Sequence, residues 1–212
     1  MISVSFLTSK DIPKTLKKLN DTNAEFIHLD VMDGKYVNNK TLPFSEMKHI
    51  YEFTDKRLDV HLMVESPSKY IKNYASLNTE YISIHLDTKE DLLANLKLIK
   101  SYGIKAGIAI NPDEEVSLLI PYLPYIDLIL VMGVNPGMGG QKFISKTIDK
   151  LKELRVLKKE YPNFKFKVSV DGGVNDVVAS KIINYTDILV SGSYVLDSDD
   201  YQKQINSLRI KS

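Results

Sequence analysis

The strongest constraint on the fold of this chain is a regular alternation of short apolar runs with amphipathic segments. Segments such as 12–19, 89–100 and 144–158 repeat apolar residues at helical spacing, with lysines on the opposite face. Asp11 and Asp113 stand where two helices would begin and are predicted N-caps. Strands and helices alternate without a linker or a Gly/Ser-rich tract, which predicts a parallel sheet. The eight predicted strands, rich in β-branched residues, cover residues 2–6, 26–32, 58–63, 81–86, 105–110, 128–132, 166–170 and 188–190.

Eight such units in 212 residues predict a closed (β/α)8 barrel, or TIM barrel, with residues 1–212 as a single domain. An open, doubly wound sheet is the alternative, because periodicity counts strands without showing whether the sheet closes. The positions of the polar residues favour the closed barrel, whose active sites lie at the carboxyl ends of the strands. Such residues within or at the ends of predicted strands are His28, Asp30, His61, Asp171 and Ser191.

Composition excludes several classes of function. The chain has 28 basic and 27 acidic residues and a net charge of +1, which gives no indication of a nucleic acid or membrane partner. Cysteine is absent, so disulfides, thiolate metal ligands and a cysteine nucleophile are excluded. No apolar run approaches the roughly 18 residues of a membrane span, and the first residues do not resemble a signal peptide. We therefore expect a cytoplasmic protein, and apolar outer helices would favour a homo-oligomer.

Two short strings place a histidine inside an apolar strand. They are HLDVMDG at 28–34 and DVHLM at 59–63. Alternation puts His28 and Asp30 on one face of the first strand, and His61 lies in the middle of the second string. Two imidazoles and a carboxylate on rigid strand ends are the donor types that a divalent metal binds. The two strings therefore predict a metal site at the barrel mouth.

A further carboxylate, Asp171, stands at the end of the seventh predicted strand. One interpretation makes it the N-cap of a helix that begins near Asn175. The other places it across the barrel mouth from Asp30, since strands two and seven are not neighbours in a closed ring. Two opposed carboxylates can remove a proton from one face of a substrate and return one to the other, with a metal stabilising the enediolate between the two steps. This arrangement is typical of an epimerase that acts beside a ketone.

Glycine-rich loops follow three successive predicted strands. VNPGMGGQKF at 134–143 follows the sixth strand, a Gly-Gly pair at 172–173 follows the seventh, and Gly192 and Ser193 follow the eighth. Glycine lets the backbone approach an anion and present N–H groups to it. In barrels the last of these loops frequently form a phosphate site. A phosphorylated ligand is therefore predicted.

The strings HLDVMDG, DVHLM, LVMGVNPGMGGQKF, VDGG and SGS resemble the motif set of the ribulose-phosphate 3-epimerase family, in register from Ser5 to about Tyr201. The resemblance implies interconversion of D-ribulose 5-phosphate and D-xylulose 5-phosphate at carbon 3, in the pentose phosphate pathway. It implies one divalent metal, no organic cofactor, Asp30 as proton acceptor and Asp171 as donor in one direction. Zinc, iron(II), manganese and cobalt(II) all suit the implied ligands, which are His28, Asp30, His61 and Asp171. The implied substrate-binding residues are Ser5, His61, Gly137, Met138, Gly139, Gly140, Asp171, Gly172, Gly173, Gly192 and Ser193.

The chain departs from the family pattern at three places. Val4 stands where the family has proline, the loop 35–44 is one residue shorter than in the family, and Met138 replaces an aromatic residue. They leave the ligand set intact but keep a ketohexose phosphate such as allulose 6-phosphate as an alternative substrate. A non-catalytic phosphosugar-binding barrel predicts loss of a ligand, and no ligand is lost. A decarboxylase on the same barrel would want a lysine near the reacting carbon, and no inward strand-end position that can be assigned is lysine.

The remaining polar residues have structural interpretations. His85 is predicted behind the ligands as an interior histidine, His49 on the outer surface, and Asp33 as a residue that fixes its loop. Asp59 is predicted to lie too far back along its strand to reach a ligand at the mouth. Three methionines at strand ends are expected to face inward, as core filling, as lining of the substrate plane, or as both: Met32, Met63 and Met132.

Overall fold

The strands of this protein close into a parallel barrel in the order of the sequence, which excludes the open sheet. The structure is a computed structural model that describes residues 1–209. Closure is made by β1, where Val4 pairs with Ile27 on one side and with Ser191 on the other. Residues 210–212 of the predicted 1–212 domain lie outside the described residues. The strands are β1 (Ile2–Ser5), β2 (Phe26–Met32), β3 (Arg57–Met63), β4 (Thr79–His85), β5 (Lys105–Ile110), β6 (Leu128–Met132), β7 (Lys167–Asp171) and β8 (Ile188–Ser191).

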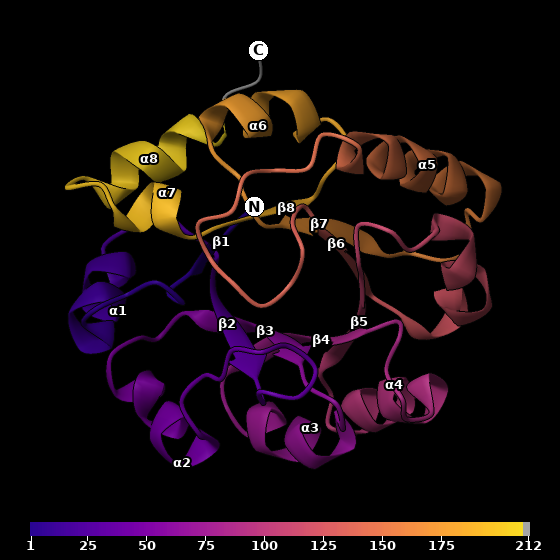
Figure 1. The fold of residues 1–212 in the computed structure, drawn as a ribbon, viewed down its shortest axis with the longest axis horizontal. Helices are drawn as coiled ribbons and strands as arrows, with labels where there is room; N and C mark the ends of the chain where they lie inside the picture. The colour runs from indigo at the N-terminus through magenta and orange to yellow at the C-terminus, as the bar shows by residue number, and fades with distance from the viewer. Residues whose placement is uncertain (210–212) are drawn as a thin grey trace.

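The α-helices lie outside the ring of strands (Figure 1). Asp11 is confirmed as an N-cap, because its side chain accepts from the Lys14 N–H at 3.1 Å. Among the described residues, none of the helices has both the length and the apolar character of a membrane span. The α-helices are α1 (Ile12–Asn20), α2 (Phe44–Met47), α3 (Ser68–Ala75), α4 (Leu92–Ser101), α5 (Thr147–Glu160), α6 (Asp176–Ile182), α7 (Ser193–Leu196) and α8 (Tyr201–Ser207), with 3-10 helices η1 (Lys48–Glu52) and η2 (Val116–Tyr125).

The prediction of Asp113 as an N-cap is wrong. The segment after β5 forms the 3-10 helix η2, which begins at Val116 without a side-chain cap. Pro121 and Pro124 lie inside it, and a proline in a helix interior removes a hydrogen bond and clashes with the preceding turn. An α-helix is therefore disfavoured in this unit of the barrel.

The barrel interior is apolar at its amino end and polar above it. Even-numbered strands contribute a buried cluster at the amino end, made of Phe26, Tyr81, Leu128 and Ile188. The next interior positions, on odd-numbered strands, are fully buried polar residues that include Ser3, Asp59 and Ser169. Alternate strands fill successive layers in such barrels. Above this polar layer, toward the carboxyl ends of the strands, the interior combines the buried histidines of β2 and β3 with a second apolar cluster of Ala109, Leu130, Met132 and Val190.

Candidate active site

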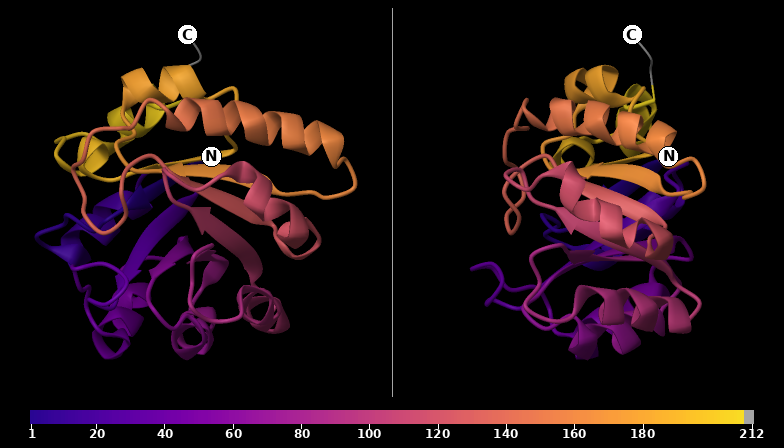
Figure 2. Two further views of the ribbon diagram at one scale, coloured as in Figure 1. Left: turned by 45° about the vertical axis from the view of Figure 1, so that its right-hand side comes forward. Right: turned by 90° about the vertical axis from the view of Figure 1, so that its right-hand side faces the viewer.

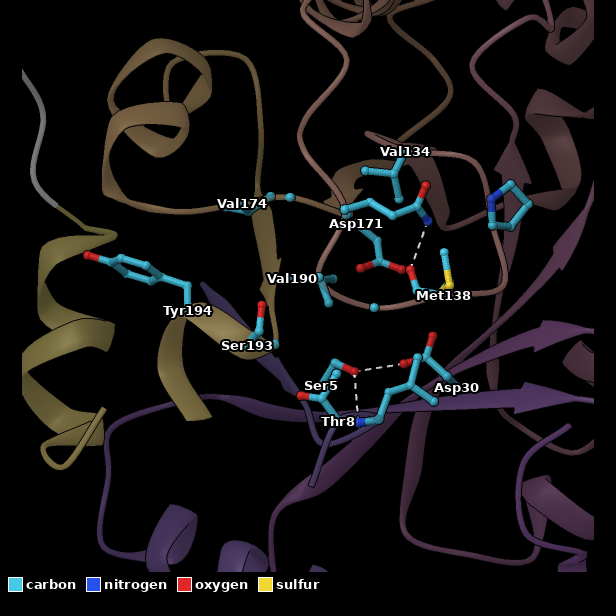
Figure 3. A pocket seen from close by; sticks show the side chains of 18 of the residues that line it. Ser5, Thr8, Asp30, Val134, Met138, Asp171, Val174, Val190, Ser193 and Tyr194 are labelled. Carbon is cyan, nitrogen blue, oxygen red and sulfur yellow. Dashed lines mark hydrogen bonds between the residues drawn. The ribbon is translucent and has the colours of Figure 1, made fainter. Parts of the chain in front are cut away.

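A cavity of about 490 Å³ opens at the carboxyl ends of the strands. The loops after β1, β6, β7 and β8 form its walls, and strand ends form its floor. Asp30 and Asp171, from β2 and β7, project toward it from two sides (Figure 3). The cavity therefore lies where the sequence predicts a site.

Four predicted ligands converge below this cavity, each offering one atom, and those atoms lie within 4.8 Å of one another: His28, Asp30, His61 and Asp171. Nε2 of His28 is 3.5 Å from Asp30 Oδ1 and 3.6 Å from Asp171 Oδ2. Nδ1 of His61 lies at the same two distances from the same oxygens. Ligands at about 2.1 Å from a tetrahedral metal are about 3.4 Å apart, so the spacing fits a single ion.

The two ring nitrogens that face these carboxylates also fit a metal. His28 Nε2 and His61 Nδ1 are buried and have no hydrogen-bond partner among the described residues. Buried polar atoms are almost always paired. A cation between the two nitrogens and the two carboxylates would satisfy all four groups, so this His/Asp cluster could bind a metal ion.

The buried histidines and carboxylates of the site stabilise one another's charged forms. Burial acts to lower the pKa of His28, but the carboxylates of Asp59, Asp30 and Asp171 outweigh it and hold that pKa well above its ordinary value. Burial acts to raise the pKa of Asp30, but His28 and His61 keep it well below its usual range. The pKa of Asp171 is lowered in the same way. In the protein without substrate both carboxylates are therefore ionised, as metal ligands must be.

Asp59 neither lines the cavity nor belongs to the four-residue cluster, so the prediction that it lies too far back to reach a ligand at the mouth is confirmed. Its Oδ2 lies 2.9 Å from His28 Nδ1 and accepts from the Ser3 hydroxyl at 3.0 Å. The side chain is fully buried. What the sequence did not predict is that Asp59 contacts the His28 side chain from below, because these two residues pair between β2 and β3.

His85 lies behind the ligands as predicted. Its Nε2 is 2.8 Å from His61 Nε2, and the ring of Tyr36 covers it at a centroid distance of 4.6 Å. Burial and the neighbouring His61 lower the pKa of His85 well below its ordinary value, so the ring is neutral. A neutral ring is a suitable partner for a metal ligand.

The three glycine loops meet along one wall of the cavity. Gly173 has a φ of +68°, and a Cβ there would lie 2.5 Å from the backbone nitrogen of Phe143. Gly172 has a φ of +106°, and its Cβ would lie 2.3 Å from Val134 Cγ2. Only glycine allows the β6 and β7 loops to approach so closely. All the predicted loop positions line the cavity, namely Gly137, Met138, Gly139, Gly140, Gly172, Gly173, Gly192 and Ser193.

The loop between β2 and α2 lies at the same end of the barrel as the glycine loop (Figure 2, right). The Asn39 side chain donates to the Gly137 carbonyl at 2.6 Å. The Tyr36 hydroxyl donates to Asp87 and accepts from Asn111. Asp33 accepts from the N–H groups of Lys35 and Tyr36, which confirms that it fixes the loop. The segment that departs from the family pattern therefore contacts the glycine loop.

The structure also tests the remaining interpretations. Ser5 lines the cavity and donates to Asp30, whereas His61 is fully buried and its substrate contact stays a prediction. Asp171 does not cap α6, because the Asn175 side chain accepts from the Val178 N–H at 2.9 Å. His49 is half exposed, which confirms its predicted place on the outer surface, and it pairs with Glu52. The three strand-end methionines line the cavity as expected, namely Met32, Met63 and Met132.

Several lining residues were missed by the sequence analysis. Leu7 and Thr8 follow β1, and their place after a strand end was a usable signal. Asp197 and Gln204 lie beyond β8, near and on α8, and extend the cavity toward the outer helices. Nothing in the sequence pattern indicates that α8 reaches the mouth.

A family model described as the ribulose-phosphate 3 epimerase family matches residues 1–196. The chain belongs to this family. The ribulose-phosphate 3-epimerase of Bacillus subtilis is 37% identical over 195 residues, covering 92% of this chain and 90% of the relative. That of Helicobacter pylori strain J99 is 38% identical over 205 residues, covering 96% and 94%. The predicted family resemblance is confirmed.

More distant solved structures share the fold of the family. The 3-hexulose-6-phosphate synthase of Salmonella typhimurium superposes with a TM-score of 0.68, covering 98% of this chain and 95% of that chain. Its sequence is only 10% identical, so this likeness shows the barrel architecture alone.

Proposed function

We propose that this protein is a metal-dependent epimerase that interconverts D-ribulose 5-phosphate and D-xylulose 5-phosphate at carbon 3, in the pentose phosphate pathway. The convergence of Asp30 and Asp171 on one cavity from two different strands carries the proposal. Opposed carboxylates can serve the two faces of a carbon in turn. Membership of the ribulose-phosphate 3-epimerase family supports the same reaction.

Each aspartate has a distinct role in the proposed reaction. Asp30, whose side chain is 6% exposed, takes the proton from carbon 3 in one direction. Asp171, whose side chain is 16% exposed, enters this direction of the reaction protonated and gives its proton to the opposite face. Proton exchange with solvent would reset both carboxylates between turnovers. In the other direction the two residues exchange roles, which inverts the configuration at carbon 3.

His28, Asp30, His61 and Asp171 would hold the divalent metal. Two imidazole nitrogens and two carboxylate oxygens suit zinc, iron(II), manganese or cobalt(II). When bound, the metal supplies Lewis-acid stabilisation of the negative charge that develops on the substrate oxygens beside carbon 3. The proposal requires no organic cofactor.

The far end of the substrate would lie among the glycine loops. Gly137 to Gly140, Gly172, Gly173, Gly192 and Ser193 would surround the phosphate. The described residues that line the cavity include no lysine or arginine, which supports backbone N–H groups as the phosphate donors. The three methionines would cover the sugar plane with an uncharged, polarizable surface.

The decisive experiment follows the proton at carbon 3. Purified protein loaded with each of the four metals in D2O should exchange the carbon 3 proton of ribulose 5-phosphate and form xylulose 5-phosphate. Parallel assays use allulose 6-phosphate, because the neighbouring wall carries Met138, which is 61% exposed. Absence of exchange with both sugars at every metal would refute the proposal, and a preference for allulose 6-phosphate would reassign the substrate.

We also propose that the chain forms a homo-oligomer. Val156 of α5 and Val177 of α6 expose 52% and 58% of their surface on outer helices, which supports an apolar contact between copies. Light scattering coupled to size exclusion measures the mass in solution, and a monomer at assay concentrations would contradict the proposal.

A further inference from the structure

The two candidate histidine ligands present opposite ring nitrogens to the metal position. His28 directs Nε2 to the carboxylates and Nδ1 to Asp59. His61 directs Nδ1 to the same carboxylates and Nε2 to His85. Each ring therefore has one nitrogen for the metal and one for a buried partner.

Asp59 determines which nitrogen of His28 carries the proton. An ionised carboxylate can only accept hydrogen bonds. Asp59 Oδ2 already accepts from Ser3, and it lies 2.9 Å from His28 Nδ1. When a metal displaces the proton on Nε2, the remaining His28 proton would therefore lie on Nδ1, and the lone pair of Nε2 would point between Asp30 and Asp171.

The same logic applies to His61 with a neutral partner. The Nε2 atoms of His61 and His85 are 2.8 Å apart, so one of them donates to the other. A free lone pair on His61 Nδ1 requires that His61 Nε2 donates and that His85 Nε2 accepts. The Tyr36 ring lies against His85 and limits the space in which that ring could turn.

The geometry points to Asp59 as the positioning residue that fixes the tautomer and orientation of His28 for metal binding, with His85 in the corresponding role for His61. This inference rests on the proposed function. A charged acceptor strengthens the hydrogen bond and raises the basicity of the ligand more than a neutral one. Loss of Asp59 should therefore weaken metal binding more than loss of His85.

The test measures zinc and manganese affinity by competition with a chelator, in wild type and in Asp59→Ala, Asp59→Asn and His85→Gln. Loss of such a partner typically weakens metal binding about 10- to 100-fold, which is the loss expected for Asp59→Ala. Asp59→Asn preserves the shape of the side chain but can either accept from or donate to His28 Nδ1. We expect an intermediate loss of about 10-fold for this variant.

Ser169→Ala is the matched control. Ser169 is fully buried in the same interior layer, on β7, and its hydroxyl has no hydrogen-bond partner among the described residues. We expect its metal affinity to equal that of wild type. Nitrogen-15 spectra of the zinc-loaded proteins report the tautomer directly, and His28 should show a protonated Nδ1 in wild type and in Ser169→Ala.

The outcomes separate this inference from the proposed function. Unchanged metal affinity and an unchanged His28 tautomer in both Asp59 variants would overturn the role of Asp59. A loss of thermal stability in the metal-free variants without a change in metal affinity would assign Asp59 a structural role and would also overturn it. Wild-type protein that binds neither metal would instead contradict the proposed function, and the inference with it.

Discussion

The Ser5 hydroxyl donates to Asp30 Oδ2 at 2.7 Å, while Oδ1 of the same carboxylate faces the ring nitrogens of His28 and His61. The two oxygens of Asp30 therefore have separate partners. Because Ser5 lies at the end of β1 and pairs with His28 across the sheet, the barrel itself sets this contact. The hydrogen bond stabilises the charged form of Asp30 and fixes its plane at the edge of the cavity.

Replacement of Ser5 by alanine should slow the reaction and change its pH dependence. A hydrogen bond to a charged group contributes about 1.5–3 kcal/mol, which corresponds to a fall in kcat of about 10-fold or more. Without the donor the pKa of Asp30 rises, so the acid limb of the kcat/KM profile should move to higher pH. Ser191→Ala is the control, because Ser191 donates to the Val174 carbonyl. Identical pH profiles for the two variants would exclude the proposed effect on Asp30.

The Asp171→Asn variant should separate proton removal from proton return. Asp30 remains able to remove the proton from one epimer, but no carboxylate supplies the opposite face. We therefore expect the rate of net epimerisation to fall by about 1,000-fold or more, within the range known for loss of a general acid–base residue. Solvent deuterium should still enter carbon 3 of one of the two sugars. Asp30→Asn should give the complementary result with the other sugar. Metal content must be measured in each sample, and normal turnover by either variant would refute its assigned role.

Binding of the metal should stabilise the fold measurably. At 100-fold excess over its dissociation constant, a metal adds about 2.7 kcal/mol, or about 5–10 °C in the unfolding midpoint of a domain this size. His61→Ala should lose this increment, because a ring nitrogen of the cluster is removed. His49→Ala is the matched control, since His49 is half exposed and pairs with Glu52. An equal thermal shift in both variants would place the metal elsewhere.

The sequence contains enough information for the barrel and for the four converging ligands. The alternation of apolar runs counts the strands, and alternation within β2 places His28 and Asp30 on one interior face. Asp171 joins them because closure of the ring brings β7 to the same mouth. In this part of the site, local pattern and global topology agree.

The role of Asp59 was not predictable, because it depends on register. Its own strand pattern places it one layer below His61, away from the mouth. Its contact with His28 arises because those two residues pair across β2 and β3, and strand periodicity does not specify which residues pair. Pro121 and Pro124, in contrast, were visible in the sequence and already argued against an α-helix after Asp113.

Substitution of Gly173 by alanine should disrupt the wall of the cavity. The new Cβ would lie 2.5 Å from the Phe143 nitrogen, at a φ of +68°. Gly103→Ala is a close control, because Gly103 has a φ of +75° and a Cβ there meets nothing within 4 Å. Backbone strain alone costs about 1–2 kcal/mol, which we expect for Gly103→Ala. Gly173→Ala should cost more in chemical denaturation and should also raise KM for the sugar phosphate; equal costs and an unchanged KM would contradict the steric argument.

The buried, neutral His85 should make the metal-free protein sensitive to acid. Its folded pKa lies below its ordinary value of 6.5, so below that pH the unfolded chain binds a proton that the folded protein does not. The stability that neutral His85 contributes is therefore present above about pH 6.5 and is lost as the pH falls, by about 1.4 kcal/mol per pH unit. His28 and His61 have raised pKa values, so their contributions to stability change with pH in the opposite direction. The free energy of unfolding of wild type must therefore be compared with that of His85→Gln, which retains both histidines. Urea denaturation between pH 7.5 and 5.5 should show that the difference in free energy of unfolding between wild type and His85→Gln becomes smaller as the pH falls. A difference that is constant across this range would mean that His85 titrates normally in the folded protein.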